Sequence, residues 1–594
     1  MSFGVLSTSS INSLVSSYTL SETDKIVTPL QNKKSRYENL SSSYSTFSSK
    51  LSALKSVLTN LKLTGTDSLF AAKSPTTSNS SFVTASASSS ATKGAYNVRI
   101  NQLAKSDIAM STDMTSATTN SITGTHNFII KTGDGSTGEY VSNVEVTFTS
   151  SETNQTVMEK IADAINSDKA VVESSAKTAS SSYSGGASSF VINLNGTETT
   201  ISVTGGGTYE QLIDEIVSSV NSNVDGVTAE KVLDSPNSGD VKLKLTVDDS
   251  SNYISISNSS GFDLVSDLNI SVTKEKGASG IVTASAFSPT TSTSQLSITS
   301  KETGVDYRIK DLSDSGSSTA LAAVGLNLGT TRTVFDQSTS PDTAGFLYAD
   351  ITDANNELNS KFEFNGLNLQ RNSNSISDLV SGVTFKLHSV MQSSDTTVNL
   401  TVANDVTSIK SSIEDFISKF NDIYTFLREN TKSTLDGRGL LIADSNATSV
   451  LNSLTSITYT PVDGLPTGDL NLLAQIGISY SSDTGLSISD SDLLESKISE
   501  NASQVEALFN STNGIANTLY DKIDPYLGSG GYIALAQSTF DTSISNYDDR
   551  IASAQKRINK SADVLRKSYE DLQNQLVELI SAQNLFSSIG GGFF

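Results

Sequence analysis

Apolar residues recur at helical spacing near both ends of the chain, and between the ends they follow the two-residue period of β-strands. Near the start they step by three and four residues in a strict heptad pattern, which is typical of a coiled-coil seam. This first stripe consists of Tyr37, Leu40, Tyr44, Phe47, Leu51, Leu54, Leu58 and Leu61. Thr28 as N-cap with Pro29 after it indicates a helix start, and Gly65 follows the helix end.

A second stripe runs from Ile544 to Leu579, and it predicts one helix over Ile544 to Phe586, roughly 65 Å long. Its members are Ile544, Tyr547, Ile551, Ala554, Ile558, Ala562, Leu565, Tyr569, Leu572, Leu576 and Leu579. One four–four step, at Ile558–Ala562–Leu565, is a stutter in the heptad pattern. An isolated helix would leave this stripe in water, so we expect it to pack antiparallel on the first stripe, on other copies, or on both. The first 20 residues are expected to become ordered only on docking.

Strand patterns with an internal repeat follow from about Ser74. Segments beginning at Phe128 and Phe190 each predict strand, strand and helix, with a period of about 62 residues. The pairs Thr156/Glu159 and Thr208/Gln211 are capping-box patterns that predict the two helix starts.

A second β-rich stretch covers residues 358–387. Phe362 and Phe364 alternate up to Asn365-Gly366, which predicts a hairpin with a type I′ turn. We expect a short helical turn over residues 376–380 and another strand after it. An amphipathic helix begins near Ile409, and shorter ones are predicted near 447–457, 490–509 and 513–527.

The predicted fold class is α+β multidomain, with β-rich heads nested between the two ends of an antiparallel helical stalk. We expect a coiled-coil leg from residues 1–40 and 545–594, and a mainly helical bundle from 41–72 and 400–544. A β-rich head takes 73–125 and 285–399. An outer head at 126–284 holds the two modules, at about 126–180 and 187–284.

Composition removes several classes of function. The chain of 594 residues has no Cys, which excludes disulfides and thiolate chemistry, and its net charge of −23 argues against nucleic-acid binding. It contains no apolar run of membrane-spanning length, and its first residues lack the basic segment of a cleaved secretory signal. If the protein leaves the cell, it uses a route without such a signal.

Signatures of catalysis or of metal binding are missing. His126 and His388 are the only histidines and have no ligand spacing. The glycines at 205–207 do not match a phosphate-binding loop, and the acidic pairs at 248–249 and 490–492 lack the calcium-loop pattern. We therefore predict no enzyme activity, no cofactor and no metal.

Several motifs, in their order along the chain, resemble the bacterial flagellar filament cap protein, also called hook-associated protein 2. One is the strand motif around residue 100, and another is the 364–384 stretch. The residues that carry the resemblance include Gly94, Tyr96, Val98, Leu103, Ala104, Asn365, Gly366, Arg371, Asn374, Gly382 and Val383. The segments "GLLIADS" from Gly439 and "LLAQIGISYSSDTGLSIS" from Leu472 extend it.

This resemblance implies a secreted structural protein at the distal tip of the flagellum, exported unfolded through the flagellar type III channel. Copies form a small ring, expected to be a pentamer. The terminal helices form legs, and the heads cover the channel, so that exported flagellin is retained, folds and is inserted. The implied partners are other copies, flagellin, hook–filament junction proteins and an export chaperone.

Two other interpretations stay open. A surface adhesin that binds a host glycan or surface would also carry β-rich heads on a coiled-coil stalk, and both roles can coexist. Another flagellar axial protein, such as a hook–filament junction protein, shares the end helices but lacks the 358–387 stretch.

Overall fold

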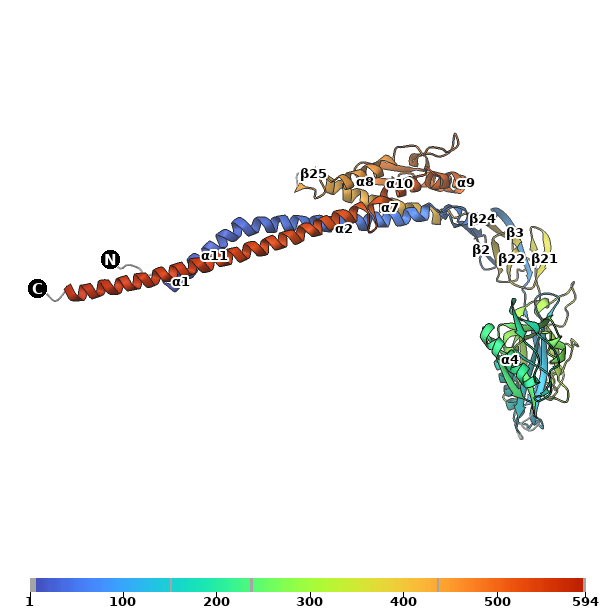
Figure 1. Ribbon diagram of the computed structural model, residues 1–594. Coiled ribbons are helices and arrows are strands. Elements are labelled where there is room, and N and C mark those ends of the chain that lie inside the picture. Colours follow the sequence, from blue (N-terminus) through green and yellow to red (C-terminus); the bar gives the residue numbers. More distant parts are fainter. Residues whose placement is uncertain (1–6, 150–151, 235–238, 435–436, 591–594) are drawn as a thin grey trace. The chain divides into compact units, whose positions relative to one another are not determined.

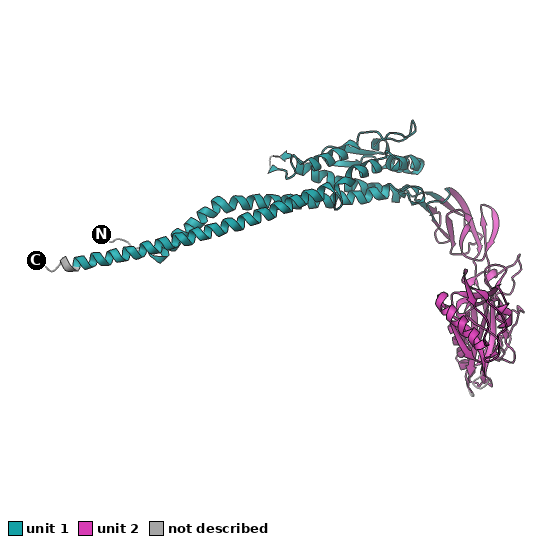
Figure 2. Ribbon diagram, in the orientation of Figure 1, with its two compact units in different colours: residues 1–74, 87–93, 402–594 teal, residues 75–86, 94–401 magenta. Residues whose placement is uncertain are grey.

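The computed structural model describes residues 7–149, 152–234, 239–434 and 437–590. The chain divides into two compact units (Figure 2). Unit 1 contains residues 1–74, 87–93 and 402–594, and unit 2 contains residues 75–86 and 94–401. Both chain ends therefore belong to one unit, and the other unit is inserted between them, which is the nested order that the sequence predicts.

Long helices from the two chain ends lie side by side in unit 1 (Figure 1). From the N-terminal side come α1 (Thr8–Glu22), the π-helix η1 (Thr23–Val27) and α2 (Thr28–Leu61). From the C-terminal side comes α11 (Tyr532–Gly590), longer than the predicted Ile544–Phe586. Two predictions are wrong here. The N-terminal segment was expected to be disordered before docking, but residues 8–22 are helical, while residues 1–6 lie outside the described residues. Thr28 is not an N-cap, because the backbone is already helical at Val27.

Shorter helices complete unit 1 and confirm the helices predicted after residue 400. They are α7 (Val406–Thr431), α8 (Ser445–Ser456), α9 (Ser491–Asn510) and α10 (Ile515–Ile523). Two small hairpins accompany them, β25 (Ser433–Thr434) with β26 (Gly437–Arg438), and β27 (Ile478–Ser481) with β28 (Gly485–Ile488). Asp405, Asp444 and Asp490 cap α7, α8 and α9 by accepting hydrogen bonds from backbone N–H groups.

The first part of the β structure combines strands from distant parts of the sequence. A five-stranded sheet has the order β1 (Lys73–Thr77), β24 (Val398–Asn404), β3 (Gly94–Gln102), β20 (Ser360–Phe364) and β21 (Leu367–Arg371). A three-stranded sheet has the order β2 (Val83–Ala87), β23 (Val383–Leu387) and β22 (Ser375–Val380). The helical turn expected over 376–380 is wrong. A register irregularity between Ile376 and Val380 gives this strand the three- and four-residue spacing of a helix.

Both predicted strand–strand–helix modules are present in unit 2. The first is β6 (Gly124–Gly133), β7 (Glu139–Phe148) and α3 (Asn154–Ser167). The second is β10 (Ser188–Leu194), β11 (Thr197–Val203) and α4 (Tyr209–Asn223). Thr208 and Gln211 form the predicted capping box. In the first module the prediction is wrong, because Thr153 rather than Thr156 caps the helix, and Asn154 is fixed there by a bond to the Thr115 carbonyl.

Unit 2 contains three further sheets, and the strands of both modules belong to the first of them. The seven-stranded sheet has the order β11, β10, β14 (Tyr253–Ser260), β15 (Lys274–Lys276), β7, β6 and β18 (Ile309–Asp314). A second sheet contains β12 (Val227–Leu233), β13 (Asp240–Val247), β8 (Val171–Glu173) and β9 (Lys177–Thr178). The third contains β16 (Val282–Phe287), β17 (Thr293–Thr303), β4 (Ser106–Met110), β19 (Gly345–Phe346) and β5 (Met114–Thr115). Two one-turn helices, α5 (Leu264–Asp267) and α6 (Ala278–Ile281), flank them.

Candidate functional site on the terminal helices

The second half of the first stripe belongs to the core of unit 1. From Tyr44 onward the stripe residues are fully buried, in a cluster that α7, α8, α9 and α10 share. Tyr44 donates from its hydroxyl to an Asp444 carboxylate oxygen at 2.6 Å. Burial, together with this bond, raises the pKa of Tyr44. This part of the stripe is closed to any other partner. It consists of Tyr44, Phe47, Leu51, Leu54, Leu58 and Leu61.

The first half of that stripe meets the second stripe, as predicted. The ring of Tyr37 stacks on that of Tyr547 at 5.8 Å and lies 6.3 Å from that of Phe540. Leu40 is half-buried beside the same core. Lys34 pairs with Asp548 at 2.6 Å. The two terminal stripes therefore pair over only part of their length.

Two small apolar clusters continue the pairing toward the chain ends. In the first, Val27 packs with Ala554 and Ile558, and Leu30 and Ile551 lie at its edge. In the second, Ile11 and Val15 pack with Ala562, with Tyr18 and Tyr569 at the edge. Residue numbers rise along one helix as they fall along the other, so the pairing is antiparallel.

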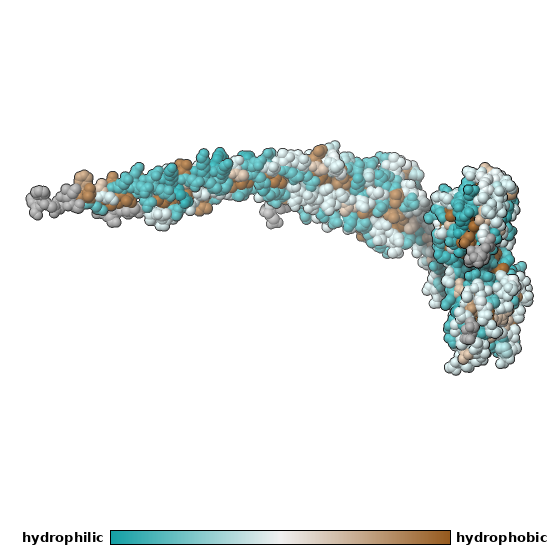
Figure 3. All heavy atoms as spheres, turned by 60° about the horizontal axis from the view of Figure 1, so that its bottom comes forward, coloured by the Kyte–Doolittle hydropathy of each residue, from teal (hydrophilic) through white to brown (hydrophobic). Residues whose placement is uncertain are grey.

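From Ser561 onward α11 carries an uncharged face, which is exposed at most of its positions. Leu572, Leu579 and Phe586 are 42%, 68% and 75% exposed and lie seven residues apart, one above the other on the helix. We call the following set the distal face: Ser561, Val564, Leu565, Ser568, Leu572, Gln575, Leu579, Ala582 and Phe586. At 100° per residue, the charged residues of this part of α11 fall outside it. Figure 3 shows hydrophobic residues recurring along the helical part of unit 1.

The other predicted residues of the second stripe are less exposed than the distal face. Half-buried positions are Ile544, Tyr547, Ile551, Leu565, Tyr569 and Leu576, and Ile558 is buried. Leu565 belongs both to the stripe and to the distal face. Next to this part of α11, helix α1 carries no charge from Thr8 to Ser21. The two helices thus offer a joint surface that is apolar or neutral.

The motif residues of the β region form the frame of the β-sheets. Tyr96 stacks on Phe364 at 5.5 Å and meets the edge of Phe385 at 5.9 Å, which links β3 to two hairpins. Gly94 opens β3 beside the Tyr96 hydroxyl, and Val98 is buried. These positions explain the motif by packing, and their side chains are engaged within the unit.

The remaining motif residues fix turns and strand ends. Asn365 and Gly366 have φ of 49° and 82°, as the predicted type I′ turn requires. Asn374 bonds both backbone groups of Ala104, at 2.7 Å and 3.0 Å, next to the half-buried Leu103. Three further motif residues have local roles: Arg371 pairs with Asp378 at 2.8 Å, Gly382 has φ of 75°, and Val383 is buried.

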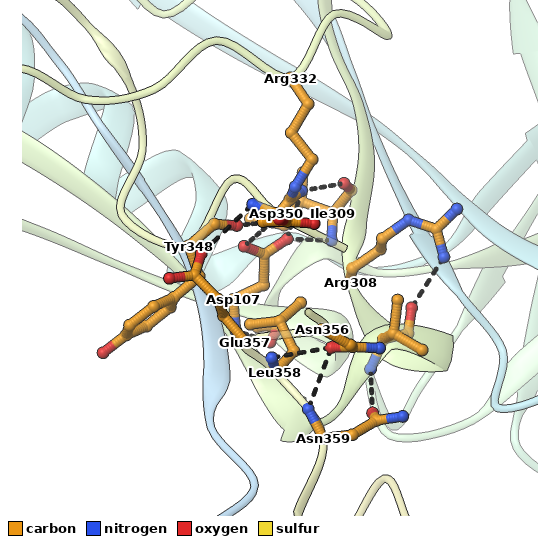
Figure 4. A network of polar contacts seen from close by, with 12 residues as sticks. Asp107, Arg308, Ile309, Arg332, Tyr348, Asp350, Asn356, Glu357, Leu358 and Asn359 are labelled. Carbon is orange, nitrogen blue, oxygen red and sulfur yellow. Dashed lines mark hydrogen bonds and ion pairs between the residues drawn. The ribbon is translucent and has the colours of Figure 1, made fainter. Parts of the chain in front are cut away.

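A buried ion pair in unit 2 was not predicted (Figure 4). Asp107 is fully buried and accepts from Arg332 at 2.6 Å and 3.0 Å and from the Ile309 backbone N–H at 2.9 Å. The Arg332 guanidinium also donates to the Tyr348 carbonyl and lies over the ring of Phe346. Two isolated residues far apart in sequence give no pattern that could have revealed this pair.

Candidate reactive residues are engaged in local structure. His126 bonds the Thr123 carbonyl and the Thr319 N–H with its two ring nitrogens, and His388 bonds the Thr84 hydroxyl. The glycines 205–207 lead into the Thr208 cap. Within the described residues, no three His, Asp or Glu side chains gather in a way that could hold a metal ion.

None of the helices in the part of the chain that the structure describes combines the length and apolar character needed to cross a bilayer.

Comparison with known proteins gives two family models that match this chain. The model "Flagellar hook-associated protein 2 N-terminus" matches residues 7–107, and "Flagellar hook-associated protein 2 C-terminus" matches residues 358–580. Together they cover more than half of the chain.

Among individual proteins, the B-type flagellar hook-associated protein 2 of Pseudomonas aeruginosa is 27% identical over 354 residues, covering 58% of this chain and 69% of that protein. The A-type protein of the same species is 26% identical over 352 residues, covering 57% and 70%. The solved D1–D2–D3 domains of the Escherichia coli flagellar cap protein cover 84% of this chain and 99% of that one, with 20% identity and a TM-score of 0.40.

The paired terminal helices and the inserted β-sheets define a structural protein that works through contact surfaces. Since both family models match, the chain belongs to the flagellar hook-associated protein 2 family, the flagellar filament caps. Flagellar cap proteins act outside the cell, as oligomers at the distal tip of the filament.

Proposed function

We propose that the distal face joins copies of this chain into the ring that caps the filament. A single observation carries this proposal: a long, exposed apolar row without charges lies on α11 just past the segment that pairs with α1. Cyclic association of about five copies would cover the row. The four-part division into leg, bundle, head and outer head is proposed with it.

The chemistry of the distal face suits contact between identical copies. Identical charged faces repel one another, whereas a neutral apolar face does not. Burying each of Leu572, Leu579 and Phe586 would contribute on the order of 1–2 kcal/mol. Several contacts of this size on each copy hold a ring together, and any one of them can be broken and remade while the others persist.

The ring is proposed to keep exported flagellin at the tip, where it folds and is added to the filament. The other proposed partners are hook–filament junction proteins at the start of growth and a chaperone before export. We further propose export without a cleaved signal, and a role that involves no catalysis. The absence of any Cys supports an unfolded passage, since no disulfide has to form on the way.

The test uses a strain that lacks this gene and carries one of three versions on a plasmid. The first is the parent, and the second replaces Leu572, Leu579 and Phe586 by Ser. The third is a matched control with Lys567, Asn574 and Glu578 replaced by Ser, on other sides of the same helix. Free flagellin in the medium and filaments on cells are measured together.

We expect the distal-face variant to release flagellin from cells with bare hooks, as the empty strain does, while the control grows filaments. Normal filaments in the empty strain would overturn the cap role for this chain. Normal filaments in the distal-face variant alone would overturn the assembly role of this face. Far-UV circular dichroism of each purified protein verifies that its helices are intact.

A further inference from the structure

The N-terminal helix crosses an irregular turn without ending. In η1 the Thr28 N–H donates to the Thr23 carbonyl, one residue farther back than in an α-helix. Pro29 accounts for the position of this turn. It has no N–H, and in a regular α-helix its ring would clash with the carbonyl of Lys25. A wider turn removes that clash while the helix continues.

This extra residue decides which side of α1 faces α11. A regular helix continued backward from Val27 would present Leu20, Ser16 and Ser13, spaced seven, eleven and fourteen residues from Val27. The structure presents Tyr18, Val15 and Ile11 instead. Because of the π-turn, the side of α1 that faces α11 is apolar, whereas a regular helix would place a mainly polar side there.

The same turn separates the two clusters in which the N-terminal helices pack on α11. Val27 is 2% exposed in one cluster, whereas its neighbour Ile26 is 36% exposed. From residue 16 to residue 26 no side chain is buried, and the next buried position is Val15 in the other cluster. The stutter of α11, at Ile558–Ala562–Leu565, begins in the first cluster and continues into the second. The irregular turn of the N-terminal helix and the stutter of α11 therefore both lie between the same two clusters.

We propose that η1 is a joint that lets α1 move on α11 independently of α2. Sparse packing makes a segment the first to open, and this segment has a wide turn and eleven consecutive residues without a buried side chain. The only ion pair that spans it, among the described residues, is Glu22 with Lys25, three residues apart on one helix.

The joint has a consequence that rests on the proposed function. Helix α1 packs on Ala562 and Tyr569, next to the start of the distal face, so a shift of α1 changes the surface that a neighbouring copy meets there. A cap that advances with the growing filament must release and remake such contacts. The joint allows this without disturbing the buried core around α2.

Purified full-length protein tests the joint without any filament. Because the chain has no Cys, two spin labels can be attached at Leu14→Cys and Val564→Cys in the same protein. The distance between them reports on the position of α1 relative to α11. A reference pair, Lys33→Cys and Arg550→Cys, reports on α2 against α11. Deleting Ile26 together with Pro29→Ala removes both the extra residue and the ring that would clash with a carbonyl, and it should leave a regular helix with both apolar faces still in phase. Deleting Thr23 together with Pro29→Ala does the same from the other end of the turn, and Ile26→Ala keeps the turn as a control.

In the parent and in Ile26→Ala we expect a broad distance distribution for the α1 pair and a narrow one for the reference pair. Either deletion should narrow the distance distribution of the α1 pair and leave that of the reference pair unchanged. Amide exchange over residues 21–28 should slow by about tenfold in the deletions, because exchange follows local opening. A distribution in the parent that is as narrow as in a correctly folded deletion would overturn the joint.

The same variants are then returned to the deletion strain. Caps without the joint should still retain flagellin but grow markedly shorter filaments than the Ile26→Ala control. Full-length filaments with either deletion would overturn the role of the joint in growth. That result is distinct from failure of the cap role itself, in which even the strain without the gene grows filaments.

Discussion

Both halves of the terminal helical pair have apolar residues at steps of three and four, but their surroundings are opposite. In α2, residues from Tyr44 to Leu61 are enclosed by four shorter helices. In the chain-end half, α1 buries only Ile11 and Val15, and α11 leaves Leu572 and Leu579 in solvent. A heptad pattern therefore specifies that a face will be covered, but not whether its own chain or another copy covers it.

The strongest test of this difference is a truncation inside the enclosed half. Leu54→Ala should lower the free energy of unfolding of unit 1 by about 3 kcal/mol, because it leaves a cavity in a fully buried site. Urea unfolding followed by circular dichroism at 222 nm measures this, since most helices lie in unit 1. A loss below about 1 kcal/mol would show that the enclosed half tolerates truncation like a surface.

Val15→Ala makes the corresponding change in the chain-end half. We expect a loss of about 1 kcal/mol, confined to α1, since Val15 packs in a small cluster with few neighbours. Amide exchange of residues 8–22 should accelerate while that of 44–61 stays unchanged. Equal acceleration in both ranges would mean that the two halves open as one unit.

A third test measures how the stability of unit 2 depends on pH, which should not involve either half of the terminal helical pair. Burial raises the pKa of Asp168 to about 6, helped by the charge of Glu275 and opposed by hydrogen bonds from Ala278 and Ser142. The folded state thus favours the protonated acid. Its stability should increase as pH falls from 7 to 5, by about 1 kcal/mol for this group.

Asp168→Asn should remove most of that pH dependence, because the amide oxygen can still accept both hydrogen bonds. Amide exchange of β7 and β15, corrected for intrinsic rates, measures it at each pH. Burial raises the pKa of Glu275 too, so a residual dependence of the same sign is expected. A variant as pH-dependent as the parent would refute the assignment to Asp168.

The smallest effect on stability is expected at the distal face. Leu579→Ser should change the unfolding free energy of the monomer by less than about 0.5 kcal/mol, because the side chain is 68% exposed. Its effect should instead appear in the sedimentation of concentrated protein, as a loss of the oligomer. A stability loss as large as that of Leu54→Ala would show that the distal face is already covered within the chain.

Much of the architecture could be predicted because the periodic signals are long. Both terminal helices, the two repeated modules and the Asn365-Gly366 turn follow from spacing and turn chemistry alone. Three local errors share a cause, which is that neighbours changed the meaning of a correct signal. Pro29 resembles a helix start but lies after a π-turn, the bulged β22 imitates helical spacing, and Thr153 caps a helix in place of Thr156.

The candidate site was only half accessible to sequence reasoning. The stripe residues were identified, but their division into enclosed and exposed parts depends on where α7 to α10 pack, which no local pattern encodes. The Asp107–Arg332 pair joins residues 225 positions apart and depends on the exact course of the strands. Burial of such a pair is a tertiary property, and neither residue stands out in its own segment.

The insertion of one unit into the other also bears on the order in which the protein can fold. Ile11 meets Ala562 across a loop of more than 500 residues, a closure that would be slow for an open chain. Strands β1 and β24 lie next to each other, and the backbone N–H of Asp405 donates to the Ala72 carbonyl beside them, so the two ends of the inserted part are held together. Once it has formed, the loop that remains between Ile11 and Ala562 is less than half as long. Closing the terminal helices after the β structure has formed therefore costs less chain entropy than closing them first.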